Sequence, residues 1–101
     1  MITASLEGSV LQVTVQTDLT IYTALELHGA LMPWLEQPCE WQLDLAEVSE
    51  VDGAGLQLLL ALRQQVLSAG HPLRLAGCSP AVNEALALCG LAAAFDDRTV
   101  A

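Results

Sequence analysis

The sequence predicts a small α/β domain: a mixed β-sheet, made of an N-terminal hairpin and parallel β-α-β units, packed against helices. Two short segments flank a Gly-Ser pair near the N-terminus, and apolar and polar residues alternate in the second of them, which is typical of a hairpin. Helical and strand patterns alternate through the rest of the chain, which is typical of β-α-β crossovers. The 101 residues fit a single domain, residues 1–101.

The hairpin is predicted from residues 2–16, with its turn at Gly8 and Ser9. Its second strand alternates apolar residues with glutamine and threonine, as a half-buried strand does. The apolar set of this strand is Leu11, Val13 and Val15.

A helix is expected next, beginning with a capping box in which Thr23 and Glu26 satisfy free backbone N–H groups. Pro33 removes one helical hydrogen bond and clashes with the preceding turn, so we expect a kink or an early end within residues 29–33. The apolar stripe of this helix is Leu27, Ala30, Leu31, Trp34 and Leu35.

Residues 40–45 alternate apolar and polar side chains and predict a strand. After a connecting loop, a helix is expected from about residue 53 to about residue 69, where Gly70 and Pro72 end it. The strand is expected to bury Trp41, Leu43 and Leu45, and the helix Leu56, Leu59, Leu60, Val66 and Leu67.

Residues 72–77 predict a short strand. Ser79 as N-cap and Pro80 as first helical residue predict a helix that Gly90 ends. Residues 91–95 are expected to pack back as a last short element. The predicted order is therefore β-β-α-β-α-β-α.

The charge narrows the range of functions. The net charge is −9, with three arginines and no lysine. Nucleic acids and anionic membranes attract cations, so we expect neither as a partner. The acidic surface either steers the protein towards a basic partner or keeps an apolar domain soluble. We see no signal peptide and no apolar run long enough to cross a membrane, and we expect a cytoplasmic protein without direct membrane insertion.

Cysteine and histidine give no sign of a metal or catalytic site. The three cysteines form no Cys-x-x-Cys pair, which argues against a disulfide framework or a zinc site. We expect Cys78 and Cys89 to be buried and Cys39 to be exposed in a loop. His28 and His71 have no ligand-spaced neighbours. No metal, no cofactor and no enzymatic activity are expected.

Asp52-Gly53-Ala54-Gly55 lies where a loop meets a helix. The Asp52 carboxylate is expected to accept the N–H of Ala54 or Gly55 and so cap the helix. Gly53 and Gly55 would let the backbone turn tightly and leave it exposed, and Gly55 would need a backbone conformation closed to other residues. A helix start attracts anions, but the glycine-lysine pattern of a phosphate-binding loop is absent. The junction is either a capped helix start alone or a contact surface.

Residues 44–62, Asp-Leu-Ala-Glu-Val-Ser-Glu-Val-Asp-Gly-Ala-Gly-Leu and onward, resemble the signature of STAS domains, the fold of bacterial anti-sigma-factor antagonists. The family pattern is roughly Asp-Leu-Ser-x-Val-x-x-x-Asp-Ser-Ser/Thr-Gly-Leu. Residues 17–27 and 71–91 resemble further parts of the family, so the likeness covers nearly the whole chain. The residues that match in register are Asp44, Leu45, Val48, Asp52, Gly55 and Leu56, with Leu19, Thr23 and Ala24 upstream.

The resemblance implies a protein-interaction module rather than an enzyme. Its partner would be an anti-sigma or serine-kinase-like protein, or a chemotaxis signalling protein. The alternative is a STAS subunit that binds the ATPase of a phospholipid-trafficking ABC transporter. The implied partner-binding residues are Asp18, Thr20, Asp52, Gly53, Ala54, Gly55 and Gln57.

The sequence also departs from the family pattern. Regulatory members are phosphorylated on the second hydroxyl residue of Asp-Ser-Ser/Thr-Gly, and here Gly53 and Ala54 occupy the two hydroxyl positions. We therefore expect no phosphorylation at the usual site. Thr20 also stands where an aspartate is usual, and Asp18 where a glutamate is usual.

Overall fold

A computed structural model describes residues 2–37 and 39–90 of the chain. The predicted order of elements is confirmed, with one short 3-10 helix, η1, added after the first helix. The last element predicted for residues 91–95 lies outside the described residues. The elements are β1 (Ile2–Glu7), β2 (Val10–Val15), α1 (Ile21–Leu31), η1 (Met32–Glu36), β3 (Glu40–Leu45), α2 (Gly53–Ser68), β4 (Leu73–Cys78) and α3 (Pro80–Leu88).

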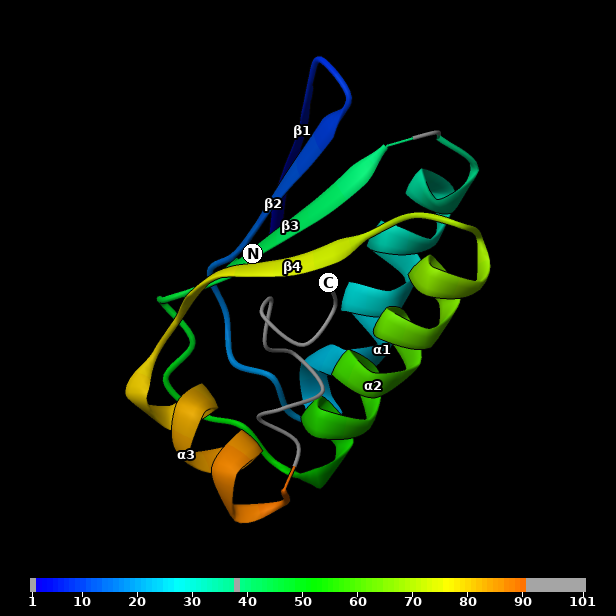
Figure 1. Ribbon diagram of the computed structural model, residues 1–101. Coiled ribbons are helices and arrows are strands. Elements are labelled where there is room, and N and C mark those ends of the chain that lie inside the picture. The colour runs from blue at the N-terminus through cyan, green and yellow to red at the C-terminus, as the bar shows by residue number, and fades with distance from the viewer. Residues whose placement is uncertain (1, 38, 91–101) are drawn as a thin grey trace.

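The sheet is mixed, as predicted. Its four strands lie in the order β1-β2-β3-β4. The β1–β2 pair is the antiparallel hairpin, and the β2–β3 and β3–β4 pairs are parallel. Helices α1 and α2 lie side by side (Figure 1). They begin at the same end of the sheet, because each follows a loop that leaves the carboxyl end of a central strand.

The central strands bury one face each, as their alternation predicts. Strand β2 buries Leu11, Val13 and Val15, and β3 buries Trp41, Leu43 and Leu45. Leu27 and Leu31 of α1 join the same core. The hydrophobic core therefore lies between the helix-facing side of the sheet and the helices.

The core stripe predicted for α2 was only partly right. Leu59 and Val66 are buried, but Leu67 is exposed, and Leu56 and Leu60 are only half-buried. The leucines of α2 cover more than half of its circumference, so their spacing alone does not fix which of them face the core. The buried residues of the helix are Gly55, Leu58, Leu59, Leu62 and Val66.

The capping box of α1 lies three residues earlier than predicted. The Thr20 hydroxyl accepts the Tyr22 N–H at 3.3 Å, and the Thr23 hydroxyl accepts the Thr20 N–H at 3.1 Å. The predicted pair of Thr23 with Glu26 was wrong, because Thr23 is the third helical residue and not the cap. The early end was right, since α1 gives way to η1 just before Pro33.

Two of the three cysteine predictions were wrong. Cys39 is buried, because the chain enters β3 there and its side chain joins the core, and this burial raises the pKa of its thiol. Cys89 is exposed at the C-terminal end of α3. Cys78 is half-buried. Burial raises the pKa of its thiol most, and the negative charge of the nearby Asp44 carboxylate raises it further.

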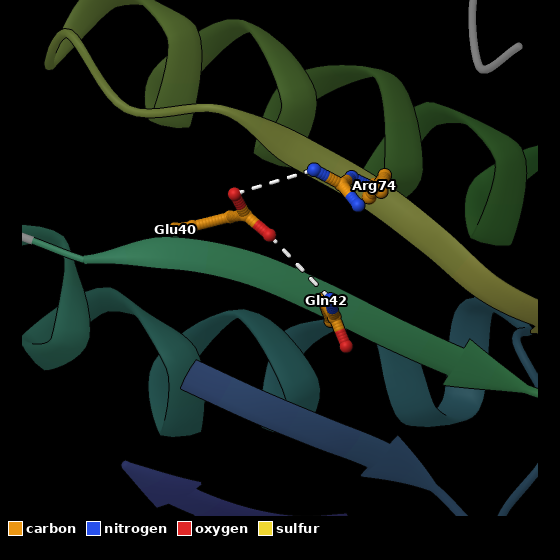
Figure 2. A network of polar contacts seen from close by, with 3 residues as sticks. All are labelled: Glu40, Gln42 and Arg74. Atoms are coloured by element: carbon orange, nitrogen blue, oxygen red, sulfur yellow. Dashed lines mark hydrogen bonds and ion pairs between the residues drawn. The ribbon is translucent and has the colours of Figure 1, made fainter. Parts of the chain in front are cut away.

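The other face of the sheet is polar. On it, Arg74 donates to one oxygen of Glu40 at 3.4 Å, and Gln42 donates to the other oxygen at 3.4 Å (Figure 2). Thr3 and Thr14 are paired on the same face of the hairpin. Such exposed polar contacts contribute little to stability.

Candidate functional site

The site forms where the loop before α1 meets the loop before α2. The Leu19 N–H donates to the Glu50 carbonyl at 2.9 Å, and the Asp52 N–H donates to the Leu19 carbonyl at 3.0 Å. Leu19 and Val51 thus form a short parallel bridge beyond the ends of the strands. The bridge holds the N-termini of the two helices next to each other.

Asp52 fastens the start of both helices. One carboxylate oxygen accepts the Gly55 N–H at 2.9 Å, which confirms the predicted cap of α2. The other oxygen accepts the Ile21 N–H of α1 at 3.0 Å. These two hydrogen bonds lower the pKa of Asp52 below its ordinary value, because they stabilise the charged form; the bond from Gly55 has the larger effect. The carboxylate therefore stays ionised at neutral pH.

Asp18, in the loop before α1, binds the backbone of the loop before α2. One of its oxygens accepts the N–H groups of Ser49 at 3.2 Å and Glu50 at 3.1 Å. The Asp18 carbonyl accepts the Thr23 hydroxyl. Each aspartate thus reaches from its own loop to the backbone of the other element, and the junction is preorganised by two reciprocal contacts.

Gly55 serves close packing rather than an unusual backbone conformation. A Cβ at this position would lie 2.0 Å from the carbonyl oxygen of Leu19, a contact that no side chain can make. Gly55 is helical and buried, and its φ is not positive. The prediction that it leaves an exposed, unusual backbone was therefore wrong. Gly53 is exposed, and a Cβ there would meet no atom within 4 Å.

A hollow of about 710 Å³ opens at this junction, and we call it the acidic hollow. Three carboxylate residues line it, whereas no lysine or arginine is among its lining residues. In residues 2–37 and 39–90, no group of three or more histidine, cysteine or acidic residues is arranged to hold a metal ion. The polar and acidic residues of the hollow are Thr17, Asp18, Thr20, Thr23, Ser49, Glu50 and Asp52, with Tyr22 at its side.

An apolar groove of about 500 Å³ runs between α1 and α2 next to the acidic hollow. The two surfaces adjoin, because Thr20 and Tyr22 line the hollow while Ile21 between them lines the groove. At the start of α2, Asp52 likewise lines the hollow, and Ala54, two residues later, lines the groove. The groove is lined by Ile21, Ala24, Leu25 and His28 of α1 and by Ala54, Gln57, Leu58 and Ala61 of α2.

The structure brings most of the predicted site residues onto one surface. Asp18, Thr20 and Asp52 line the acidic hollow, and Ala54 and Gln57 line the groove. Gly53 lies exposed between them, and Gly55 lies buried beneath.

Sequence reasoning missed the apolar part of this surface. Ile21, Tyr22 and Leu25 are 65%, 91% and 84% exposed. The available signal was their position on α1, outside the stripe that contains Leu27 and Leu31.

Comparison with known proteins identifies the family. Residues 2–96 match the family model described as "Mlab, STAS domain". The fold is similar to that of a Thermotoga maritima protein described as an anti-sigma factor antagonist, with a TM-score of 0.80 and 18% identity over 89% of this chain and 79% of that one. It is also similar to the anti-sigma factor antagonist SpoIIAA in its unphosphorylated form, with a TM-score of 0.75 and 14% identity over 90% of this chain and 82% of that one.

A search of curated proteins gives no significant match. Among the described residues, no helix has the length and apolar character required to span a membrane. The family model covers nearly the whole sequence, and the mixed four-stranded sheet with its helices agrees with it. The chain therefore belongs to the STAS domain family.

Proposed function

We propose that this STAS domain is a non-enzymatic interaction module that docks on another protein through the junction of α1 and α2. One observation carries the proposal: the acidic hollow and the exposed apolar groove form one continuous surface around Asp52 and Ala54. Exposed apolar residues gathered beside charged ones are typical of a protein-binding surface. Neither the hollow nor the groove contains a nucleophile paired with a base, so no reaction is assigned to them.

The docking surface is permanently competent in this proposal. A phosphate at residue 53 or 54 would add about two negative charges at the border of the groove. Gly53 and Ala54 have no hydroxyl to accept it. Binding would then be controlled by the supply or the state of the partner, and not by modification of this chain at the junction.

We propose a cytoplasmic bacterial signalling protein as the partner, either an anti-sigma or serine-kinase-like protein or a component of a chemotaxis system. The fold shared with two proteins described as anti-sigma factor antagonists supports this class. The preorganised junction supports it as well, because rigid binding surfaces lose little conformational entropy on association.

A second candidate is a subunit that binds the ATPase of a phospholipid-trafficking ABC transporter. The missing hydroxyls at residues 53 and 54 favour it, since a constitutive subunit needs no switch. The matching family model is described as "Mlab" and not as an anti-sigma factor antagonist, so the family match by itself does not favour signalling.

An affinity pull-down at native expression level tests the proposal and separates the two candidates. Ala54→Glu places a charge beside the groove at the favourable end of the α2 dipole, so the fold should persist. Ala87→Glu, on an exposed position of α3, is the matched control. We expect a partner that is lost with Ala54→Glu and kept with Ala87→Glu. A kinase-like or chemotaxis protein supports signalling, whereas an ABC ATPase supports the second candidate. Equal recovery by both variants would remove the junction from the interface.

A further inference from the structure

We propose that the apolar groove binds one amphipathic helix of a different protein, with its apolar side chains in the groove and lysine or arginine residues facing the acidic hollow. The inference rests on the proposed function and names the chemistry of the partner. It is carried by the exposure, spacing and charge of the described residues along α1 and α2.

The exposed apolar residues of α1 form a patch. Ile21 and Leu25 are four residues apart, so they lie one above the other on the helix, and Tyr22 lies beside them. A single exposed leucine is normal in a folded protein. Three large side chains that are each 65% to 91% exposed on little more than one helical turn are not explained by folding.

The groove is long enough to contact two turns of a helix. Residues 21, 24, 25 and 28 of α1 and residues 54, 57, 58 and 61 of α2 line it, each set spanning two helical turns, or about 10 Å. Small side chains form part of its lining, at Ala24, Ala54 and Ala61. Small residues between two helices permit close approach of a third, which would contact the groove through residues at the same helical spacing.

The charge at the end of the groove selects a basic partner. Asp18, Glu50 and Asp52 lie where α1 and α2 begin, and no lysine or arginine is among the residues that line either surface. Glu50 is exposed, so its charge faces the incoming partner. Opposite charges across an interface fix its orientation and raise the association rate.

A second copy of this chain is a poor occupant by the same argument. Each copy contributes twelve acidic residues and only three arginines, and its net charge of −9 repels its twin. An anionic lipid surface is repelled too. A basic amphipathic helix from another protein satisfies both the apolar and the acidic part of the surface.

Site-specific photo-crosslinking tests the inference in the cells that make the protein. A benzoylphenylalanine replaces Tyr22 in the full chain, and the control variant carries it at Leu88, which is 80% exposed on α3. We expect Tyr22-specific crosslinks to one segment of another protein, with apolar residues at helical spacing and flanking lysine or arginine. Crosslinks to a second copy of this chain, to an acidic or non-helical segment, or to no protein would overturn the inference.

Binding of that segment as a synthetic peptide then measures the two parts of the surface. Leu25→Glu should weaken binding at least about tenfold, whereas Leu88→Glu should leave it unchanged. Glu50→Gln should weaken it a few-fold, mainly through slower association, and added salt should act in the same direction. Equal affinity of the two leucine variants, or binding that does not respond to salt, would contradict the inference.

The failure of this inference can be told apart from the failure of the proposed function. If the pull-down partner is lost with Ala54→Glu but retained with Leu25→Glu, the partner docks at the start of α2 and no helix lies along the α1 side of the groove. If neither variant affects any partner, the proposed function itself is wrong. Thermal unfolding of each variant confirms that a loss of binding is not a loss of fold.

Discussion

The open face of the sheet and the outer side of α1 both face away from the core, yet their side chains differ sharply. On the sheet, Glu40, Gln42 and Arg74 form a polar network across two strands (Figure 2). On α1, the outward side chains include Ile21 and Leu25, both mostly exposed. Folding requires apolar residues only on the side that faces the core.

The difference supports the proposed docking surface. The polar face of the sheet follows the usual pattern for a surface in contact with water. The outer side of α1 departs from that pattern, and it does so beside the junction that the family motif marks. The departure, rather than the fold, points to the docking surface.

The largest expected change in stability is the difference between substitutions on the buried and on the exposed side of α1. Leu27→Ala removes a buried side chain and should lower the free energy of unfolding by about 2–5 kcal/mol. Leu25→Ala, two residues earlier on the exposed side, should change it by less than about 0.5 kcal/mol. Urea denaturation measures both. A large effect of Leu25→Ala would mean that the chain itself covers the outer side of α1, and the comparison would fail.

Two glycines of the junction give the next effect. Gly55→Ala drives a methyl group into the Leu19 carbonyl, so the loop and helix must move apart at a cost of about 1–3 kcal/mol or more. Gly53→Ala meets nothing and should be neutral or stabilising by up to about 1 kcal/mol. Equal stability of the two variants in urea would show that Leu19 and α2 are not packed as described.

The stability of the junction should depend on pH through Asp52. Its pKa is lowered in the folded state, so its contribution to stability is present above the ordinary value of 3.8 and disappears as pH falls through the lower folded value. Asp52→Asn keeps a cap oxygen for Gly55 but has no second oxygen for the Ile21 N–H. We expect a lower melting temperature at neutral pH and a weaker dependence on pH below about 4.

Melting curves between about pH 2.5 and 7 measure this effect. Glu47→Gln removes one negative charge from an exposed loop position and serves as the control for net charge. If Asp52→Asn and Glu47→Gln change the profile alike, the effect belongs to overall charge and not to the two hydrogen bonds of Asp52.

The smallest effect is expected on the open face of the sheet. Glu40→Gln removes a surface ion pair with Arg74 at 3.4 Å and should change the free energy of unfolding by less than about 1 kcal/mol. Partner binding should be unaffected. A loss of binding with this variant would show that the partner docks on the open face of the sheet and not on the outer side of α1.

The fold was largely predictable because its signals are local. Alternation in residues 10–15 and 40–45 identified the buried strands, and Ser79 with Pro80 marked the start of α3, where the Ser79 hydroxyl accepts the Val82 N–H at 3.2 Å. The exact packing side of α2 was not predictable from spacing, since the leucines at residues 56, 58, 59, 60 and 62 cover more of the helix than its contact with the core needs.

The site was only half predictable because its key contacts join residues far apart in sequence. Local spacing predicts that Asp52 caps its own helix. It cannot predict the bond to Ile21, 31 residues away, or the bonds of Asp18 to Ser49 and Glu50. Gly55 is required by its close contact with Leu19, which is distant in sequence. The sequence alone shows only that the residue is small.

The open space around Gly53 lets this position take a larger side chain while the scaffold stays the same. Apart from the residue itself, its two neighbours in the chain and its own helix backbone, no atom lies within 4 Å of a Cβ at that position, so a serine there requires no rearrangement of the core. Hydroxyl residues at positions 53 and 54 would give the family's phosphorylation motif while the aspartates that organise the junction stay in place. Under the proposed function, a change of one or two codons would therefore add or remove the phosphorylation motif without a change to the aspartates that organise the junction.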